Sequence, residues 1–198
     1  MAPGRTDRNM TDELIVKHCS PTLAGIKTGN LFSVSFDSDR DMVEEIRGIN
    51  RILTPRGLRA IPFRKSGSHF LLYVFRPDKL AEDLSEPRAL NILREKGYRI
   101  RSVSGCVAQL ANRICGTGGF PHEIGLFLGY PPEDVKGFID SISCGCGASR
   151  GAKLTGYWKV YGDVQKAADC FARFDRCTKA YRAALSRGRS LEQLIVRS

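Results

Sequence analysis

Proline and glycine residues punctuate the middle of this 198-residue chain and restrict what it can fold into. The densest stretch is residues 120–139, where prolines and glycines alternate with aromatic and aliphatic side chains. Further breaks fall at Gly97 and at residues 116–119. Because proline and glycine end or weaken helices, this part of the chain is predicted to form only short helices. We expect them over residues 77–84, 86–96, 102–115, 122–128 and 132–140.

Strand patterns flank this helical block. Residues 31–36 alternate along the chain with the period-2 pattern of a half-buried strand. Residues 58–63 and 69–75 are joined by a short basic segment and predict a β-hairpin. Residues 157–161 predict a fourth strand. The sequence therefore predicts an α+β fold, with a small, mostly antiparallel four-stranded sheet, helices packed on one face and a helical insertion before the last strand.

Capping residues mark the expected starts of the other helices. Thr11 precedes two acidic residues and predicts the start of the first helix. Ser38 or Asp39 is expected to cap a helix that closes at residues 55–57. Asp163 precedes the longest apolar pattern of helical spacing, which ends at Gly188, and Ser190 opens a last short helix.

Length and composition predict one compact unit. Hydrophobic residues make up 42% of the chain, enough for an ordinary core. We expect residues 1–9 to form a disordered tail and residues 10–198 a single α+β domain. The longest apolar runs are too short to span a bilayer, and the first ten residues lack the apolar core of a signal peptide. A cytoplasmic protein with no membrane segment is the expectation.

The formal net charge is +10 at pH 7. A basic surface favours phosphate-bearing or acidic partners such as nucleic acid, nucleotides or an acidic electron carrier. The basic residues are spread over almost every segment, which favours a solvated surface without a dedicated partner.

The chain contains seven cysteines, an odd number. They indicate buried thiols, a metal or cluster site, or a redox-active thiol rather than a disulfide framework. Cys144 and Cys146 lie two residues apart in a glycine-rich segment, and Cys170 and Cys177 lie two turns apart on the longest helix. If these four cysteines converge in the fold, they would make a four-thiolate metal site. The alternative is that they are ordinary buried thiols.

A second candidate combines Cys19, His122 and Glu123 as nucleophile, base and orienting group. The neighbouring His18 cannot serve as the base, because adjacent helical residues point about 100° apart. The alternatives are that Cys19 packs in the core, and that His122 and Glu123 start a helix after Pro121.

The segment 157–161 provides a third candidate. In a strand, Tyr157, Lys159 and Tyr161 would share one face, and Trp158 and Val160 the other. Aromatic and basic side chains on one sheet face can stack nucleobases or flavin rings, although the same residues could simply cover a sheet edge. The chain has neither a P-loop nor a dinucleotide-binding glycine motif, which argues against standard ATPase and dinucleotide folds.

Several segments match, in order, the pattern of one family: residues 18–32, 73–77, 120–139, 156–162, 177–178 and 188–190. From about residue 10 onward the chain resembles the domain-of-unknown-function family 3793. Lys27, in the first motif, is a candidate ligand-binding residue together with Tyr157, Lys159 and Tyr161. The resemblance implies a bacterial, anaerobe-associated cytoplasmic protein of unassigned activity, with relatives near flavodoxin or iron-handling functions. Members often carry a cysteine where this chain has Tyr157, which weakens a cluster that needs that thiol.

Three functional hypotheses follow. The first is an accessory protein of anaerobic redox or iron metabolism that binds a cofactor, a metal or an acidic redox partner such as flavodoxin. The second is a nucleic-acid or nucleotide-binding protein that uses residues 64–65 of the hairpin and the Tyr157–Tyr161 face. The third is a thiol-dependent enzyme built on Cys19. The sequence does not name the cofactor.

Overall fold

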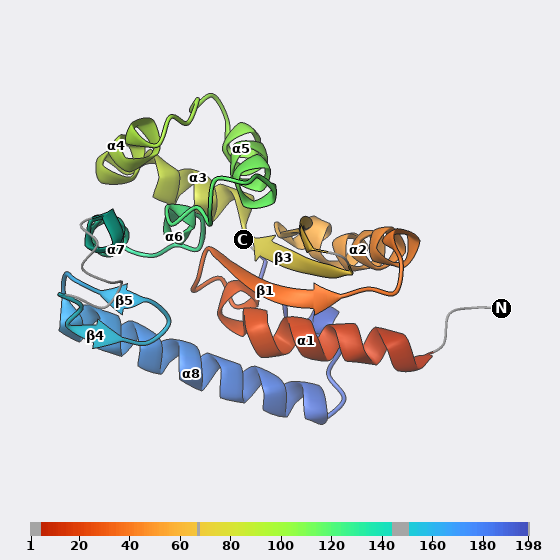
Figure 1. Cartoon of the computed structure of the whole chain (residues 1–198). Helices are drawn as coiled ribbons and strands as arrows, with labels where there is room; N and C mark the ends of the chain where they lie inside the picture. The colour runs from red at the N-terminus through yellow and green to blue at the C-terminus, as the bar shows by residue number, and fades with distance from the viewer. Residues whose placement is uncertain (1–4, 67, 144–150, 198) are drawn as a thin grey trace.

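A computed structural model describes residues 5–66, 68–143 and 151–197 of the chain (Figure 1). Within these residues, none of the helices combines the length and apolarity needed to cross a lipid bilayer. The elements in chain order are α1 (Arg5–Leu23), β1 (Gly29–Ser35), α2 (Asp39–Leu53), η1 (Thr54–Arg56), β2 (Arg59–Ser66), β3 (His69–Phe75), α3 (Pro77–Ser85), α4 (Pro87–Glu95), α5 (Val103–Cys115), α6 (Ile124–Phe127), α7 (Pro132–Ser143), β4 (Leu154–Thr155), β5 (Lys159–Val160), α8 (Val164–Ser186) and η2 (Leu191–Leu194).

The main sheet has three antiparallel strands in the order β1-β3-β2. Phe75 of β3 lies opposite Gly29 of β1 on one side and Arg59 of β2 on the other. All residues of β3 after His69 are buried, because the strand is central and both of its faces are covered. The predicted hairpin of β2 and β3 is confirmed.

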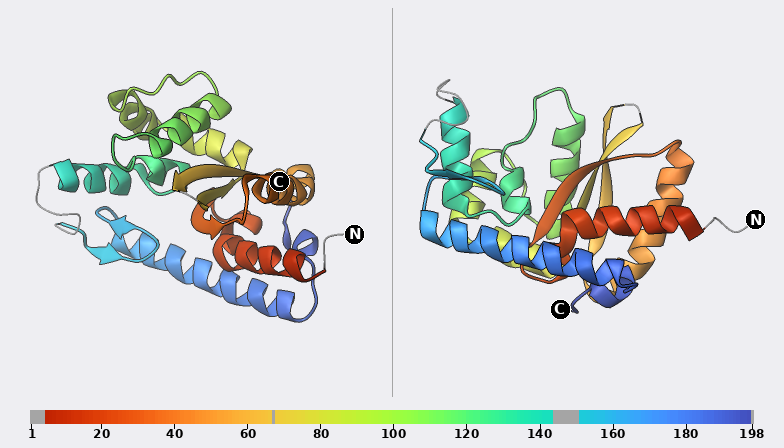
Figure 2. Two further views of the ribbon diagram at one scale, coloured as in Figure 1. Left: turned by 45° about the vertical axis from the view of Figure 1, so that its right-hand side comes forward. Right: turned by 90° about the horizontal axis from the view of Figure 1, so that it is seen from below.

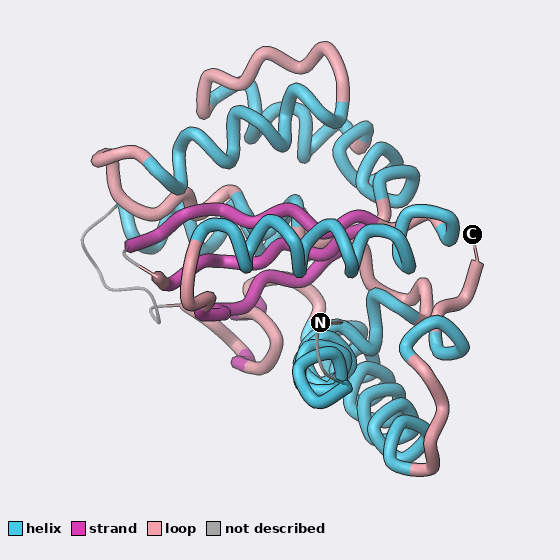
Figure 3. Tube along the Cα trace, turned by 90° about the vertical axis from the view of Figure 1, so that its right-hand side faces the viewer, coloured by secondary structure: helices cyan, strands magenta, loops and turns pink. Residues whose placement is uncertain are grey.

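Helices cover both faces of this sheet, as the side view shows (Figure 3). Leu72 and Val74 of β3 enter a core with α1, α2 and η2. Leu71, Tyr73 and Phe75 point the other way, into a core with α3 to α7. The prediction that helices pack on one face is therefore wrong, because β3 is apolar on both of its faces.

The prediction of a four-stranded sheet is also wrong. Residues 157–161 contribute only the short strand β5, which pairs antiparallel with β4 in a separate two-stranded sheet. The helical insertion from α3 to α7 does precede this sheet, as predicted. Beyond β5, the backbone N–H groups of Tyr161 and Gly162 donate to the side chain of Asp134 on α7 instead of to a neighbouring strand. The segment is therefore held against α7 and α8, away from the main sheet (Figure 1).

Three predicted helix starts are confirmed. The side chains of Ser38, Asp163 and Ser190 accept hydrogen bonds from backbone N–H groups in the first turns of α2, α8 and η2. Ser190 also forms a capping box with Gln193. Gly188, just beyond α8, has a positive φ of 85°, the backbone conformation that favours glycine at a helix end.

The first helix is longer than predicted. It begins at Arg5 rather than at Thr11, so residues 5–9, expected in a tail, are helical. The sequence between Arg5 and Thr11 contains no proline or glycine that would stop the helix. At its other end, α1 continues past Pro21 to Leu23, because a proline near the last turn interrupts little of the hydrogen bonding.

Candidate ligand pocket

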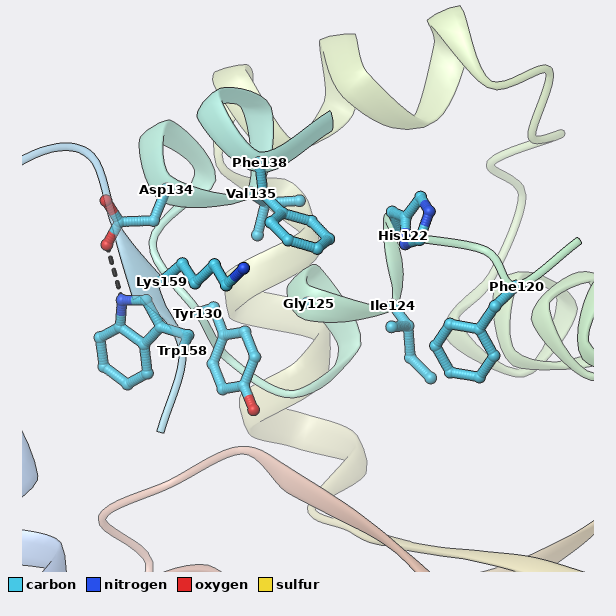
Figure 4. A pocket seen from close by; sticks show the side chains of 10 residues that line it. All are labelled: Phe120, His122, Ile124, Gly125, Tyr130, Asp134, Val135, Phe138, Trp158 and Lys159. Carbon is cyan, nitrogen blue, oxygen red and sulfur yellow. Dashed lines mark hydrogen bonds between the residues drawn. The ribbon is translucent and has the colours of Figure 1, made fainter. Parts of the chain in front are cut away.

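A pocket of about 400 Å³ opens between α6, α7 and the β4–β5 sheet (Figure 4). Pockets of about 300–1,000 Å³ with mostly apolar walls and a few polar groups are typical of small-molecule sites. Its lining residues are Phe120, His122, Ile124, Gly125, Tyr130, Asp134, Val135, Phe138, Trp158 and Lys159.

Aromatic rings make up most of its wall. The Tyr130 and Trp158 rings stack, with centroids 4.9 Å apart and planes 30° apart. His122 and Phe138 meet edge to face at 5.3 Å. Phe120 is 48% exposed, an unusual fraction for a phenylalanine side chain, and lies near His122. The pocket thus offers flat aromatic surfaces from three separate segments of the chain.

Asp134 fixes the position of the tryptophan. Its carboxylate accepts hydrogen bonds from Trp158 Nε1 at 2.7 Å and from the backbone N–H groups of Tyr161 at 2.7 Å and Gly162 at 2.8 Å. The residue is 3% exposed and lies in the first turn of α7, where the helix dipole favours a negative charge. Figure 4 shows the carboxylate directed toward the indole. Asp134 therefore joins α7 to β5 and holds one wall of the pocket.

Gly125 allows α6 and α7 to approach closely. A Cβ atom at this position would lie 2.7 Å from Cγ2 of Val135 and 3.1 Å from Cδ2 of Tyr130. Contacts this short force a shift of the neighbouring groups. A glycine is therefore required here by packing, since a larger residue would displace two lining side chains.

Apart from Trp158, whose indole N–H donates to Asp134, two lining side chains carry nitrogen atoms that can contact a ligand: Lys159 and His122. Lys159 reaches between Phe138 and Tyr130, with its ammonium directed toward the middle of the pocket (Figure 4). Its Nζ lies 5.6 Å from the centroid of the Phe138 ring. The His122 ring contacts the edge of the same phenylalanine. The pocket thus combines an aromatic wall with a cation and an imidazole.

Lys27 contacts the same wall but does not line the pocket. It is only 4% exposed, and its Nζ lies 5.3 Å from the centroid of the Tyr130 ring. The ammonium donates to the Gly29 carbonyl and, at 3.2 Å, to Asn30 Oδ1. Within the described residues no carboxylate lies within 4 Å of it.

This burial changes the acid–base behaviour of Lys27. Loss of solvation lowers the pKa of its ammonium to about 8, although the thiols of Cys19 and Cys170 act in the opposite direction. Burial also raises the pKa of the Cys19 thiol to about 12. Lys27 is therefore only partly charged just above neutral pH, while Cys19 is protonated there.

The structure does not bring Cys19, His122 and Glu123 together. Cys19 is fully buried in the core on the α1 side of the sheet. Glu123 is 3% exposed, accepts a hydrogen bond from Tyr98 at 3.1 Å and lies 3.7 Å from Arg113. His122 alone faces the pocket. The geometry therefore does not favour the nucleophile, base and orienting arrangement.

Half of the proposed thiolate site falls outside what the structure describes. Cys144 and Cys146 lie outside the described residues. Cys170 and Cys177 on α8 carry free thiols whose pKa values are raised by burial. Within the described residues, no group of three or more His, Cys, Asp or Glu side chains is arranged to hold a metal ion.

Tyr157, Lys159 and Tyr161 do not form one open face. The Tyr157 hydroxyl donates to Asp175 of α8 at 2.9 Å. The Tyr161 hydroxyl lies 3.1 Å from the hydroxyl of Ser141 on α7. Of these three residues, only Lys159 lines the pocket. Trp158, which the strand pattern places on the opposite face from Lys159, lines the same pocket. The alternation fails because β5 is only two residues long.

Phe120, Tyr130, Asp134 and Phe138 were missed as lining residues by sequence reasoning. All four lie in residues 120–139, which the sequence marks as distinctive by its aromatic content. An acidic residue in the first turn of a helix is common, so the position of Asp134 in the sequence does not indicate a role in a pocket. The aromatic residues of this stretch were the signal that could have located the pocket.

The fold and site define an α+β protein with a helix-covered antiparallel sheet and an aromatic-lined pocket beside it. The family model described as "Protein of unknown function (DUF3793)" matches residues 15–195, and the chain belongs to this family. The resemblance seen in the sequence is thereby confirmed. No curated protein and no solved structure matches the chain.

Proposed function

We propose that this protein is a non-catalytic binding protein that holds a planar heteroaromatic anion, such as a flavin nucleotide, in the aromatic pocket. The observation that supports this proposal is the combination of stacked aromatic walls with Lys159 and His122 in one cavity of about 400 Å³. Ring faces favour a flat ligand, and the lysine ammonium favours a ligand with a negatively charged group.

The ligand would lie among Phe138, Tyr130 and Trp158. Stacking on aromatic side chains contributes about 1–3 kcal/mol per ring where it has been measured for nucleobases. Lys159 would reach the anionic group of the ligand, and His122 would donate or accept a hydrogen bond at the pocket edge. Because Asp134 already accepts three hydrogen bonds, it would orient Trp158 rather than contact the ligand.

The role we propose for such a protein is that of a cytoplasmic accessory factor in the redox metabolism of anaerobic bacteria. The family resemblance motivates this part of the proposal, and the basic surface suits an acidic redox partner such as flavodoxin. An organic cofactor is favoured over a metal ion because the pocket presents rings and nitrogen donors rather than a cluster of thiolates or carboxylates.

Trp158 is the sole tryptophan of the chain, so its fluorescence reports on the pocket without labelling. Purified protein is titrated with flavin mononucleotide and, in parallel, with riboflavin, which has the same ring system without the phosphate. Binding of both is measured by calorimetry and by Trp158 emission. We expect the phosphorylated ligand to bind at least about tenfold more tightly, because a charge-assisted hydrogen bond contributes about 1.5–3 kcal/mol.

Two pocket variants and one control separate the contributions. Lys159→Met is expected to remove the preference for the phosphorylated ligand, and Phe138→Ala to weaken both ligands. Lys17→Met, at an exposed position on α1, removes the same charge elsewhere and should leave both affinities unchanged. If neither ligand changes Trp158 emission, or if all variants bind like the wild type, the proposed site is wrong.

A further inference from the structure

A second surface lies at the C-terminal end of α8, away from the pocket. It consists of exposed basic side chains and is called here the C-terminal basic surface: Arg176, Lys179, Arg182, Arg187 and Arg189. Residues 176–191 contain no acidic side chain. Helix α8 packs against α1 and forms the outermost layer of the molecule on that side (Figures 1 and 2).

These basic side chains are not neutralised within the part of the chain that the structure describes. Among the described residues, no carboxylate oxygen lies within 4 Å of any of these five side chains. The acid that follows most closely in sequence, Glu192, pairs instead with Arg56 at 2.6 Å. Five positive charges therefore remain on about 20 Å of one helix and its C-terminal extension, given a rise of about 1.5 Å per residue.

The shape of this surface suits a polyanion. Lys179 and Arg182, with Asp175 and Thr178, border a hollow of about 390 Å³ on one flank of α8. Asp175 is engaged there by the Tyr157 hydroxyl. Alanines at positions 180 and 183 are exposed between the basic residues, so a partner can approach the helix backbone closely.

We propose that the C-terminal basic surface binds the phosphate backbone of duplex nucleic acid. Four of the five side chains are arginines, whose planar donors match phosphate oxygens in pairs. A protein partner is disfavoured, because stable protein interfaces need large apolar or aromatic anchors. Within the described residues, no large exposed hydrophobic side chain lies between positions 176 and 191.

The number of contacts sets the expected salt dependence. Each neutralised phosphate contributes about 0.9 to the slope of log affinity against log salt concentration. Five contacts predict a loss of affinity of about 500-fold between 50 and 200 mM KCl. Removal of three contacts should reduce this loss to about 12-fold.

The test is fluorescence anisotropy of a labelled 20-base-pair duplex at several KCl concentrations. The triple variant Arg176→Ala/Lys179→Ala/Arg187→Ala is compared with Arg47→Ala/Arg51→Ala/Arg94→Ala. The control removes the same net charge from exposed helix positions elsewhere. Circular dichroism of both variants checks that they remain folded.

We expect the α8 variant to bind the duplex at least tenfold more weakly at 50 mM KCl and with the shallower slope, while the control stays within about threefold of wild type. Equal weakening by both variants would mean that only net charge acts, and would overturn the proposal. A second titration uses polyglutamate at the same charge concentration. If polyglutamate binds as tightly as the duplex and depends equally on α8, the surface recognises acidic protein and the nucleic-acid assignment fails.

Discussion

Asp134 provides the sharpest test of how the pocket wall is held. In Asp134→Ala, three donors lose their acceptor: the indole N–H of Trp158 and the backbone N–H groups of Tyr161 and Gly162. Hydrogen bonds to a charged group contribute about 1.5–3 kcal/mol each, but neighbouring terms do not add fully. Each buried donor left without an acceptor costs about 1–3 kcal/mol, so with incomplete additivity we expect the free energy of unfolding to fall by about 3–5 kcal/mol.

Urea unfolding followed by Trp158 emission measures this loss. With an m-value of about 2 kcal/mol per molar urea, a loss of about 4 kcal/mol moves the midpoint down by about 2 M. The emission maximum of the folded variant should also shift, because the indole N–H of Trp158 loses its carboxylate acceptor. Asp134→Asn keeps one amide oxygen as an acceptor, so its urea midpoint should lie between those of the wild type and Asp134→Ala.

The matched control is Asp140→Ala on the same helix. Asp140 is exposed and pairs with Lys136 at 2.7 Å, an i,i+4 surface pair that contributes about 0.3–0.5 kcal/mol. If Asp134→Ala unfolds at the same urea concentration as Asp140→Ala, the three hydrogen bonds do not hold the wall, and the reasoning about this carboxylate is refuted.

Three further predictions concern buried or tightly packed positions. The pKa of Lys27 is lowered to about 8 in the folded chain, whereas the ordinary lysine pKa is 10.5, so between these pH values the unfolded chain binds more protons than the folded one. In urea unfolding, the wild type should therefore gain about 3 kcal/mol of stability relative to Lys27→Met as the pH rises from 8 to 10.5. A stability difference that does not change with pH would contradict this. Gly125→Ala places a Cβ atom 2.7 Å from a methyl carbon of Val135 on α7 and should lower the free energy of unfolding by about 1–3 kcal/mol. In the same urea assay, the control Gly118→Ala should leave the free energy of unfolding nearly unchanged, because its Cβ atom would have no neighbouring atom within 4 Å. In pulsed alkylation followed by mass spectrometry, buried Cys19 should react far more slowly than exposed Cys115, and rapid labelling of Cys19 would revive the thiol-enzyme hypothesis.

The parts of the fold that depend on residues close together in sequence could be predicted from the sequence. The hairpin of β2 and β3 was predictable because its apolar runs and connecting turn are adjacent in sequence. The caps at Ser38, Asp163 and Ser190 were predictable because a side chain bonds to a backbone group only three residues away.

Long-range contacts were not predictable. The β5 segment has a strand-like pattern, yet its partner beyond β4 is a carboxylate 27 residues earlier in the chain. Lys27 lies in a motif that suggests ligand binding, but only the folded structure shows that it is buried against Tyr130 rather than exposed in the pocket. The candidate pocket combines three segments, and no pattern within one segment reveals which aromatic rings meet.

The most direct test of the proposed function follows the indole N–H of Trp158 by ¹⁵N-¹H correlation spectroscopy. The single tryptophan gives one indole signal, assigned without further work. Titration with flavin mononucleotide should move this signal saturably, at the dissociation constant found by calorimetry, and Lys159→Met should require at least about tenfold more ligand. If calorimetry shows binding while the indole signal stays fixed, the ligand binds elsewhere and the aromatic pocket is not its site.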